Sequence, residues 1–259
     1  MATKKEKETK ATAKPAKAKK ERSGKRAPKE GKRYAAARAG VEFGKVYQLA
    51  DAIALVKNNA KAKFDETIDI AINLGIDAAN TEQVVRGTVP MPKGLGKKIR
   101  VAVFVNDANK AKEAKAAGAD LVGAADLIEE IKKGKVDFDK CIATPDMMAQ
   151  VSQVAKILGP RGLMPNPKLG TVTPDVAKAV QTLKAGQVEF RAEKGGVVHA
   201  GVGKASFNEK DLEENIKAFA KAINLAKPSG LKGIYIKKVT LSSTMGPGVI
   251  VDVQTLLAA

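Results

Sequence analysis

Two stretches of the chain combine cations with groups that could contact RNA. Lys63 stands beside Phe64, and Thr67 follows on the polar side of an expected strand. Much later, Lys238 precedes the turn Ser243-Thr244-Met245-Gly246. An ammonium group can pair with a phosphate, an aromatic ring can stack on a base, and a small polar turn admits a ribose-phosphate backbone. These residue types favour RNA binding, although Phe64 could equally lie in the core and the turn could be an ordinary hairpin.

Residues 159–170 form the least regular stretch, with three prolines and three glycines in twelve positions. Proline lacks the amide donor that helix interiors and central strands require, so we expect a long, specially shaped loop. Arg161 and Lys168 could make this loop a phosphate cradle. However, the chain has neither a P-loop pattern nor a Gly-x-Gly-x-x-Gly run after a strand. A rigid connection between two helices is therefore the better interpretation.

Residues for catalysis or metal binding are scarce. His199 is the only histidine and Cys141 the only cysteine, so no zinc cluster and no Cys/His nucleophile set can be assembled. We expect Cys141 to be a small apolar residue of a buried strand, and His199 to be structural or to lie near RNA. We therefore predict no enzymatic activity, no cofactor and no metal. A nucleotide-binding enzyme built on the centre of the chain is the second hypothesis.

The charge distribution points to a polyanion as partner. The net charge is +18, and residues 1–40 hold 15 Lys and Arg but only 4 Asp and Glu. Lys and Arg that neutralise phosphates release condensed counterions, so nucleic acid is favoured. An anionic membrane competes less well, since we find no spanning apolar run and no secretory signal. A single cysteine fits a reducing compartment. Residues 1–40 have almost nothing to bury and are expected to be disordered when free.

The outer parts of the chain share a half-polar style of strand. We expect a helix over residues 48–60, and an alternating strand over 68–74 with one polar face. Another strand is expected over 84–89, followed by a Pro/Gly linker. After Gly186, Val188 and Phe190 alternate with polar residues, and Val197-Val198 is expected to form their hairpin partner. Beyond these we expect a helix that begins at Asn208, a strand through residues 234–241, a turn at 242–248 and a last strand at 249–253.

One detail of the strand through residues 234–241 is informative. Ile234 and Ile236 are followed by Val239 and Leu241, so the apolar parity slips by one residue at Lys237-Lys238. A strand that keeps one face in the core needs one extra residue at such a slip. The sequence therefore predicts a β-bulge there.

The centre of the chain differs in style. Residues 101–105 form a continuous apolar run, as expected of a strand buried on both faces of a parallel sheet. Short strands at 121–122 and 141–143 alternate with helices that end at Gly118 and Gly134. Two further helices are expected, from Thr144 to Gly159 and from Thr173 to Gly186. This alternation is typical of a small parallel α/β unit.

We therefore predict an α/β protein of two domains behind a basic tail. A discontinuous α+β domain for RNA binding would comprise residues 41–94 and 187–259. A Rossmann-like parallel α/β domain, residues 95–186, would be inserted into it. The two chain crossings near residues 95 and 186 would make a natural hinge.

Several of these stretches resemble one known family. The run Gly159-Pro160-Arg161-Gly162-Leu163-Met164-Pro165-Asn166-Pro167-Lys168, with Gly170-Thr171-Val172, resembles the signature of the family of large-subunit ribosomal protein one, the stalk protein. Shorter runs resemble this family in the expected order, and together the resemblance covers about residues 45–255. They are Ala62-Lys63-Phe64, Asn73-Leu74-Gly75-Ile76-Asp77, Val85-Arg86-Gly87-Thr88, Lys184-Ala185-Gly186-Gln187, Gly203-Lys204 and Ser243-Thr244-Met245-Gly246.

The resemblance implies a structural protein that is a monomer within the cytoplasmic ribosome. It would bind large-subunit ribosomal RNA, form a mobile stalk and assist the release of deacylated transfer RNA from the exit site. It would also repress translation of its own operon messenger RNA. The implied RNA-binding residues are Lys63, Phe64, Thr67, Arg191, Lys204, Lys238, Ser243, Thr244, Met245 and Gly246. The basic tail lies outside the resemblance, so a role for it rests on charge alone.

Overall fold

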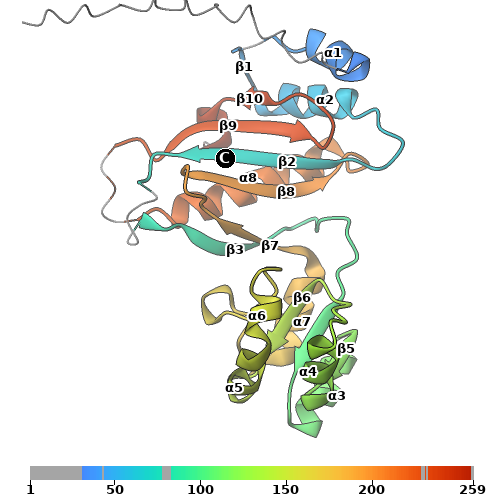
Figure 1. The fold of residues 1–259 in the computed structure, drawn as a ribbon. Helices are drawn as coiled ribbons and strands as arrows, with labels where there is room; N and C mark the ends of the chain where they lie inside the picture. The colour runs from blue at the N-terminus through green and yellow to red at the C-terminus, as the bar shows by residue number, and fades with distance from the viewer. Residues whose placement is uncertain (1–30, 43, 78–82, 229–230, 232, 258–259) are drawn as a thin grey trace, which may run out of the picture. The chain divides into compact units, whose positions relative to one another are not determined.

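A five-stranded sheet pairs strands from the early and the late parts of the chain (Figure 1). The computed structural model describes residues 31–42, 44–77, 83–228, 231 and 233–257. The strand order is β1-β10-β9-β2-β8, and the central β2 runs antiparallel to both neighbours. The strands are β1 (Val46–Tyr47), β2 (Thr67–Leu74), β8 (Val197–Lys204), β9 (Ile236–Ser243) and β10 (Val249–Val251).

One face of this sheet is covered by helices and the other carries polar side chains. Burial alternates along β2, with Ile68, Ile70 and Ile72 fully inside. These residues share a core with α2 (Leu49–Asn59), α8 (Glu209–Leu225) and α9 (Val253–Leu257). The residues that alternate with these buried ones point to the opposite face, which we call the open face. It includes Thr67, Asp69, Ala71, Asn73, Lys238, Thr240, Ser242, His199 and Gly201.

The predicted bulge in β9 is confirmed. The pairing between β2 and β9 shifts by one residue, because Asn73 lies opposite Lys238 whereas Leu74 lies opposite Ile236. Lys237 and Lys238 are both exposed, between buried Ile236 and Val239. The extra residue keeps the apolar side chains of both halves of β9 on the core side.

Two further strands form a separate ladder. β3 (Arg86–Pro90) pairs antiparallel with β7 (Gln187–Arg191). The predicted hairpin between the strand at 188–190 and Val197-Val198 is therefore wrong, since residues 197–204 pair with β2 instead. The connection is nonetheless a tight turn, with Glu193 N donating to Val197 O at 2.9 Å. Residues 197–204 pair with β2 rather than with β7 because this longer pairing buries Val198, Ala200 and Val202 in the core.

The centre of the chain forms the expected parallel sheet. Its order is β5-β4-β6, with β4 (Val101–Phe104), β5 (Leu121–Gly123) and β6 (Lys140–Ala143). α4 (Ala125–Lys132) packs on one face, while α3 (Ala108–Ala116) and α7 (Val176–Gly186) pack on the other. All four residues of β4 are buried, which explains its continuous apolar run.

Two predictions of local structure are wrong. Residues 145–158 are not one helix but η2 (Pro145–Met147), α5 (Met148–Val151), η3 (Ser152–Val154) and α6 (Ala155–Leu158). The hydroxyl of Ser152 donates to Met148 O at 2.7 Å, a side-chain bond to the preceding turn that bends helices. Residues 32–39, expected to be disordered, form the exposed helix α1 (Lys32–Ala39). Its four alanines have the highest helix propensity. Residues 1–30 lie outside the described chain.

The buried residues of the described chain fall into three hydrophobic cores. Buried residues of the core beside the five-stranded sheet come from 49–91 and 188–256, and those of the two cores beside the parallel sheet from 101–183. Residues 32–259 nevertheless form one compact unit, so the division into two domains stays a prediction. None of the described helices has the length and apolar character needed to cross a membrane.

Candidate nucleic-acid interface

A pair of threonines joins the two stretches that could contact RNA. The backbone N–H of Thr67 donates to Thr244 Oγ1 at 3.0 Å, and that hydroxyl donates to Thr67 O at 3.2 Å. Thr244 N also donates to Thr67 O at 3.1 Å. The start of β2 and the end of β9 are thus fixed against each other. We call residues 63–67, 204–206 and 243–246 the recognition corner.

Glu66 organises this corner from beneath. Its side chain is 1% exposed, and its carboxylate accepts hydrogen bonds from Ala62 N at 2.8 Å and from Met245 N at 3.0 Å. Burial raises the pKa of this carboxyl, but the bonds from Met245, from a poorly aligned Ser243 hydroxyl and from Ala62 bring the pKa below its ordinary value. A buried carboxylate therefore holds both the loop before β2 and the turn after β9.

Lys204 closes the third side of the corner. Its ammonium donates to Thr67 Oγ1 at 2.8 Å, while Asp65 accepts from Ser206 N at 3.2 Å and from Ser206 Oγ at 2.8 Å. Lys204 also lies opposite Thr67 in the pairing of β8 with β2. A cation is thereby positioned at the edge of the open face, where a phosphate could approach it.

The groups left outside this network are those suited to bases and phosphates. Phe64 and Met245 are each 55% exposed, so the alternative that Phe64 is part of the core is excluded. Lys63 is exposed and, within the part of the chain that the structure describes, has no hydrogen-bond or ion-pair partner. An apolar ring, a thioether and a free ammonium on a rigid support can stack and pair with single-stranded or looped RNA.

Ser243 and Gly246 give the turn its compact shape. A Cβ atom at Gly246 would lie 2.5 Å from Ser243 Oγ, so a larger residue would force the turn to move. Ser243 is 4% exposed, and its hydroxyl makes no well-formed hydrogen bond among the described residues. Gly246 N donates to Ser243 O at 3.2 Å. The turn is therefore more tightly supported than an ordinary hairpin loop.

Two expected RNA-binding residues lie away from the corner. Arg191 ends β7 and faces Arg86 across the two-stranded ladder. Lys238 lies opposite Asn73, six residues before Thr244 on β9. At about 3.4 Å per residue, Lys238 is about 20 Å from Thr244 along the strand. Lys63, Phe64, Thr67, Lys204, Ser243, Thr244, Met245 and Gly246 are brought together.

Sequence reasoning missed Glu66 and Asp65. A signal for Glu66 exists, because it shares the parity of Ile68, Ile70 and Ile72 and so had to point toward the core. A carboxylate at an inward position needs hydrogen-bond partners there. The partners themselves, Ala62 N and Met245 N, could not be read from spacing, since one of them lies 179 residues away.

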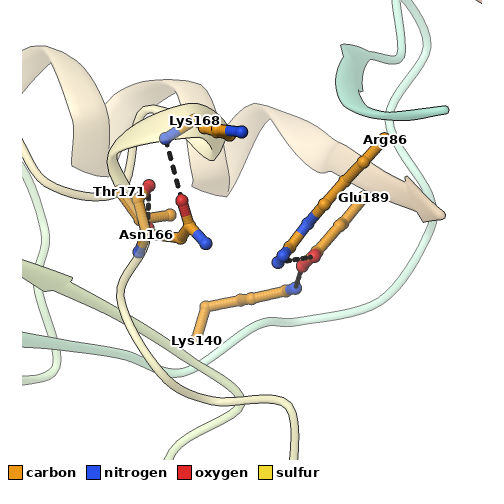
Figure 2. Close-up of polar contacts among 6 residues, drawn as sticks. All are labelled: Arg86, Lys140, Asn166, Lys168, Thr171 and Glu189. Carbon is orange, nitrogen blue, oxygen red and sulfur yellow. Dashed lines mark hydrogen bonds and ion pairs between the residues drawn. The ribbon is translucent and has the colours of Figure 1, made fainter. Parts of the chain in front are cut away.

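The loop at 159–170 has a different construction (Figure 2). Asn166 Oδ1 accepts from Lys168 N at 2.9 Å, and Asn166 N donates to Thr171 Oγ1 at 2.7 Å. Leu163 and Met164 pack against the core beside α4. Cys141 is buried, its thiol donates to Leu163 O, and burial raises its pKa to about 12. The predicted apolar role of Cys141 is confirmed, and the loop is well suited to a rigid connection.

An ion-pair group connects the two-stranded ladder to the parallel sheet (Figure 2). Glu189 on β7 binds Arg86 on β3 at 2.9 Å and Lys140 on β6 at 3.3 Å. These side chains are 26 to 31% exposed, so water screens the attraction only in part. The described residues hold no group of three or more side chains that could bind a metal ion.

A cationic corner with an exposed aromatic ring on a rigid polar support is typical of RNA-binding proteins. Residues 56–247 match the model of the Ribosomal protein L1p/L10e family, and the chain belongs to this family. The resemblance seen in the sequence is thereby confirmed. The chain is a ribosomal RNA-binding protein of the large subunit, structural rather than enzymatic, and its place is the cytoplasmic ribosome.

Proposed function

We propose that the recognition corner is the surface with which this chain binds large-subunit ribosomal RNA. The observation that carries the proposal is the reciprocal hydrogen bonding of Thr67 and Thr244. It fixes Phe64 and Met245 in exposed positions without cost to the core. Binding therefore requires little ordering of the protein, which favours affinity and specificity together.

Three finer roles are proposed by resemblance to the family. Bound through the corner, the chain would form a mobile stalk, and it would assist release of deacylated transfer RNA from the exit site. The same corner would bind the operon messenger RNA if that RNA presents the same local shape, and free protein would then repress its own translation. In this scheme ribosomal and messenger RNA compete for one site.

The substitution Thr244→Ala tests the corner. It removes the hydroxyl that accepts a hydrogen bond from Thr67 N. We therefore expect specific binding to a ribosomal RNA stalk fragment to weaken by about 1–2 kcal/mol. Binding to random RNA depends on charge and should stay nearly unchanged. Filter binding or calorimetry at fixed salt measures both affinities. Thr244→Ser keeps the hydroxyl and should restore the affinity.

Thr182→Ala is a matched control, since Thr182 also donates a hydrogen bond but lies on α7. It should leave both affinities unchanged. Equal losses on stalk and random RNA for Thr244→Ala would show that the corner contributes charge only. Competition between the stalk fragment and the operon messenger RNA tests the shared site. Addition of the chain to ribosomes that lack it should speed loss of deacylated transfer RNA from the exit site.

A further inference from the structure

A second cationic surface lies on the same open face, away from the recognition corner. A groove of about 290 Å³ opens between α1, the loop before β1 and strands β9 and β10. Three cations line it, Arg38, Lys45 and Lys238, against one carboxylate, Glu42. The lining also includes the hydroxyl groups of Tyr34 and Thr240 and a few aliphatic side chains, among them Ile250.

We propose that this α1 groove binds the phosphate backbone of the same RNA that the recognition corner recognises. The proposal rests on the proposed function, because it names where more of that RNA is held. It also gives a role to Lys238, which lies too far from Thr244 to join the corner. Most of the groove lies outside the part of the chain that matches the family, since Tyr34, Arg38, Lys45 and Ile250 precede or follow residues 56–247.

The strand register makes the groove continuous with the corner. Lys238 and Thr240 share the parity of Ser242 on β9, while Val239 and Leu241 are buried on the core side. Thr240 lies opposite Ile250 on one side and Ala71 on the other. The open face therefore runs without interruption from Lys204 on β8 to the groove. An RNA strand leaving the corner along β9 would reach Lys238 after about 20 Å.

Helix α1 also carries a cation whose charge acts on the corner. Burial raises the pKa of Glu66, hydrogen bonds led by that from Met245 N lower it, and the positive charge of Arg33 adds to the lowering. Arg33 is on α1, as are Tyr34 and Arg38 of the groove. One short helix thus carries a cation that acts on Glu66 and another that lines the groove.

The chemistry of the groove fits phosphates better than an apolar ligand. Lys238 has no hydrogen-bond or ion-pair partner among residues 31–42, 44–77, 83–228, 231 and 233–257. Lys45 pairs with Glu42 at 3.2 Å, with both side chains more than half exposed, so a phosphate can replace this weak partner. The Tyr34 and Thr240 hydroxyls can donate to phosphate oxygens.

A triple variant of the full chain, Arg38→Gln/Lys45→Gln/Lys238→Gln, tests the groove. The matched control is Lys210→Gln/Lys221→Gln/Lys227→Gln, which removes the same charge from exposed lysines of α8 and the residues after it. α8 packs on the core face of the sheet, away from the open face. Affinity for the stalk fragment is measured from about 50 to 400 mM salt, with hydroxyl-radical footprinting of the RNA.

Each phosphate contact removed should lower the slope of log K against log salt by about one. We expect the groove variant to lose two to three units of slope on this count, and the control less than about one. Footprints should lose protection at nucleotides that Thr244→Ala leaves protected. Equal slopes and footprints for the two triple variants would overturn the proposal and assign the groove to another acidic partner. Failure of the proposed function differs, since Thr244→Ala would then not affect specific binding.

Discussion

The recognition corner and the loop at 159–170 solve the problem of an irregular backbone in opposite ways. In the corner, polar atoms from distant parts of the chain bind one another and apolar side chains face the solvent. In the loop, Asn166 accepts a hydrogen bond from Lys168 N and donates one to the Thr171 hydroxyl. The side chains of Leu163, Met164 and Leu169 turn inward. The loop is the more recognisable sequence, but its side chains are used to support the fold. The corner is less conspicuous, and it presents the groups that RNA can bind.

The comparison predicts that substitutions in the loop lower the stability of the fold, whereas substitutions in the corner lower the affinity for RNA. Leu169→Ala empties a site that is 4% exposed, so we expect the free energy of unfolding to fall by about 2–5 kcal/mol. RNA affinity of the folded protein should hardly change. Urea denaturation and binding at a temperature well below the transition measure both. A large loss of RNA affinity in the folded variant would contradict the supporting role of the loop.

Phe64→Ala should show the reverse. Its ring is 55% exposed and would stack on a base, so its removal should cost about 1–3 kcal/mol of specific RNA binding. The free energy of unfolding should change little. Phe64→Tyr, which keeps the ring, should retain most of the affinity. If Phe64→Ala destabilised the fold as much as Leu169→Ala, the contrast between corner and loop would fail.

The smallest expected effect is a pH dependence of the corner. The pKa of Glu66 in the folded protein lies below its ordinary value of 4.5, so the ionised form stabilises the fold. This contribution is fully present above pH 4.5 and is lost as the pH falls through the lowered pKa. The stability difference between wild type and Glu66→Gln should therefore be larger at pH 7 than at pH 3, as urea denaturation would show. Glu113→Gln, on α3, serves as control, and a difference that grows toward low pH would contradict the assignment.

Much of the fold was predictable because the spacing of apolar residues in the sequence indicates which side chains are buried. The alternation of β2, the apolar run of β4 and the parity slip of β9 each predicted a feature that the structure contains. The predictions failed where a tertiary contact decides. Val198 could pair with β7 or β2 by its sequence, and only the buried partner surface of β2 selects between them.

The candidate site was predictable in its residue types but not in its support. Lys63, Phe64 and Thr244 stand out as cation, aromatic and turn residue. Glu66 does not stand out in this way, although it shares the parity of the buried residues of β2. The Ser152 hydroxyl likewise interrupts a helix through one local bond that composition does not reveal.

The sequence separation of the Thr67–Thr244 pair has a consequence for synthesis. The two residues are 177 positions apart, and β2 finds both of its partner strands only in the last third of the chain. Contacts of such long range form late in folding. While the chain is being made, the loop at Phe64 has no turn to pack against until residue 244 has been added. A nascent chain that ends before Thr244 therefore lacks the recognition corner and, under the proposed function, should not compete for RNA.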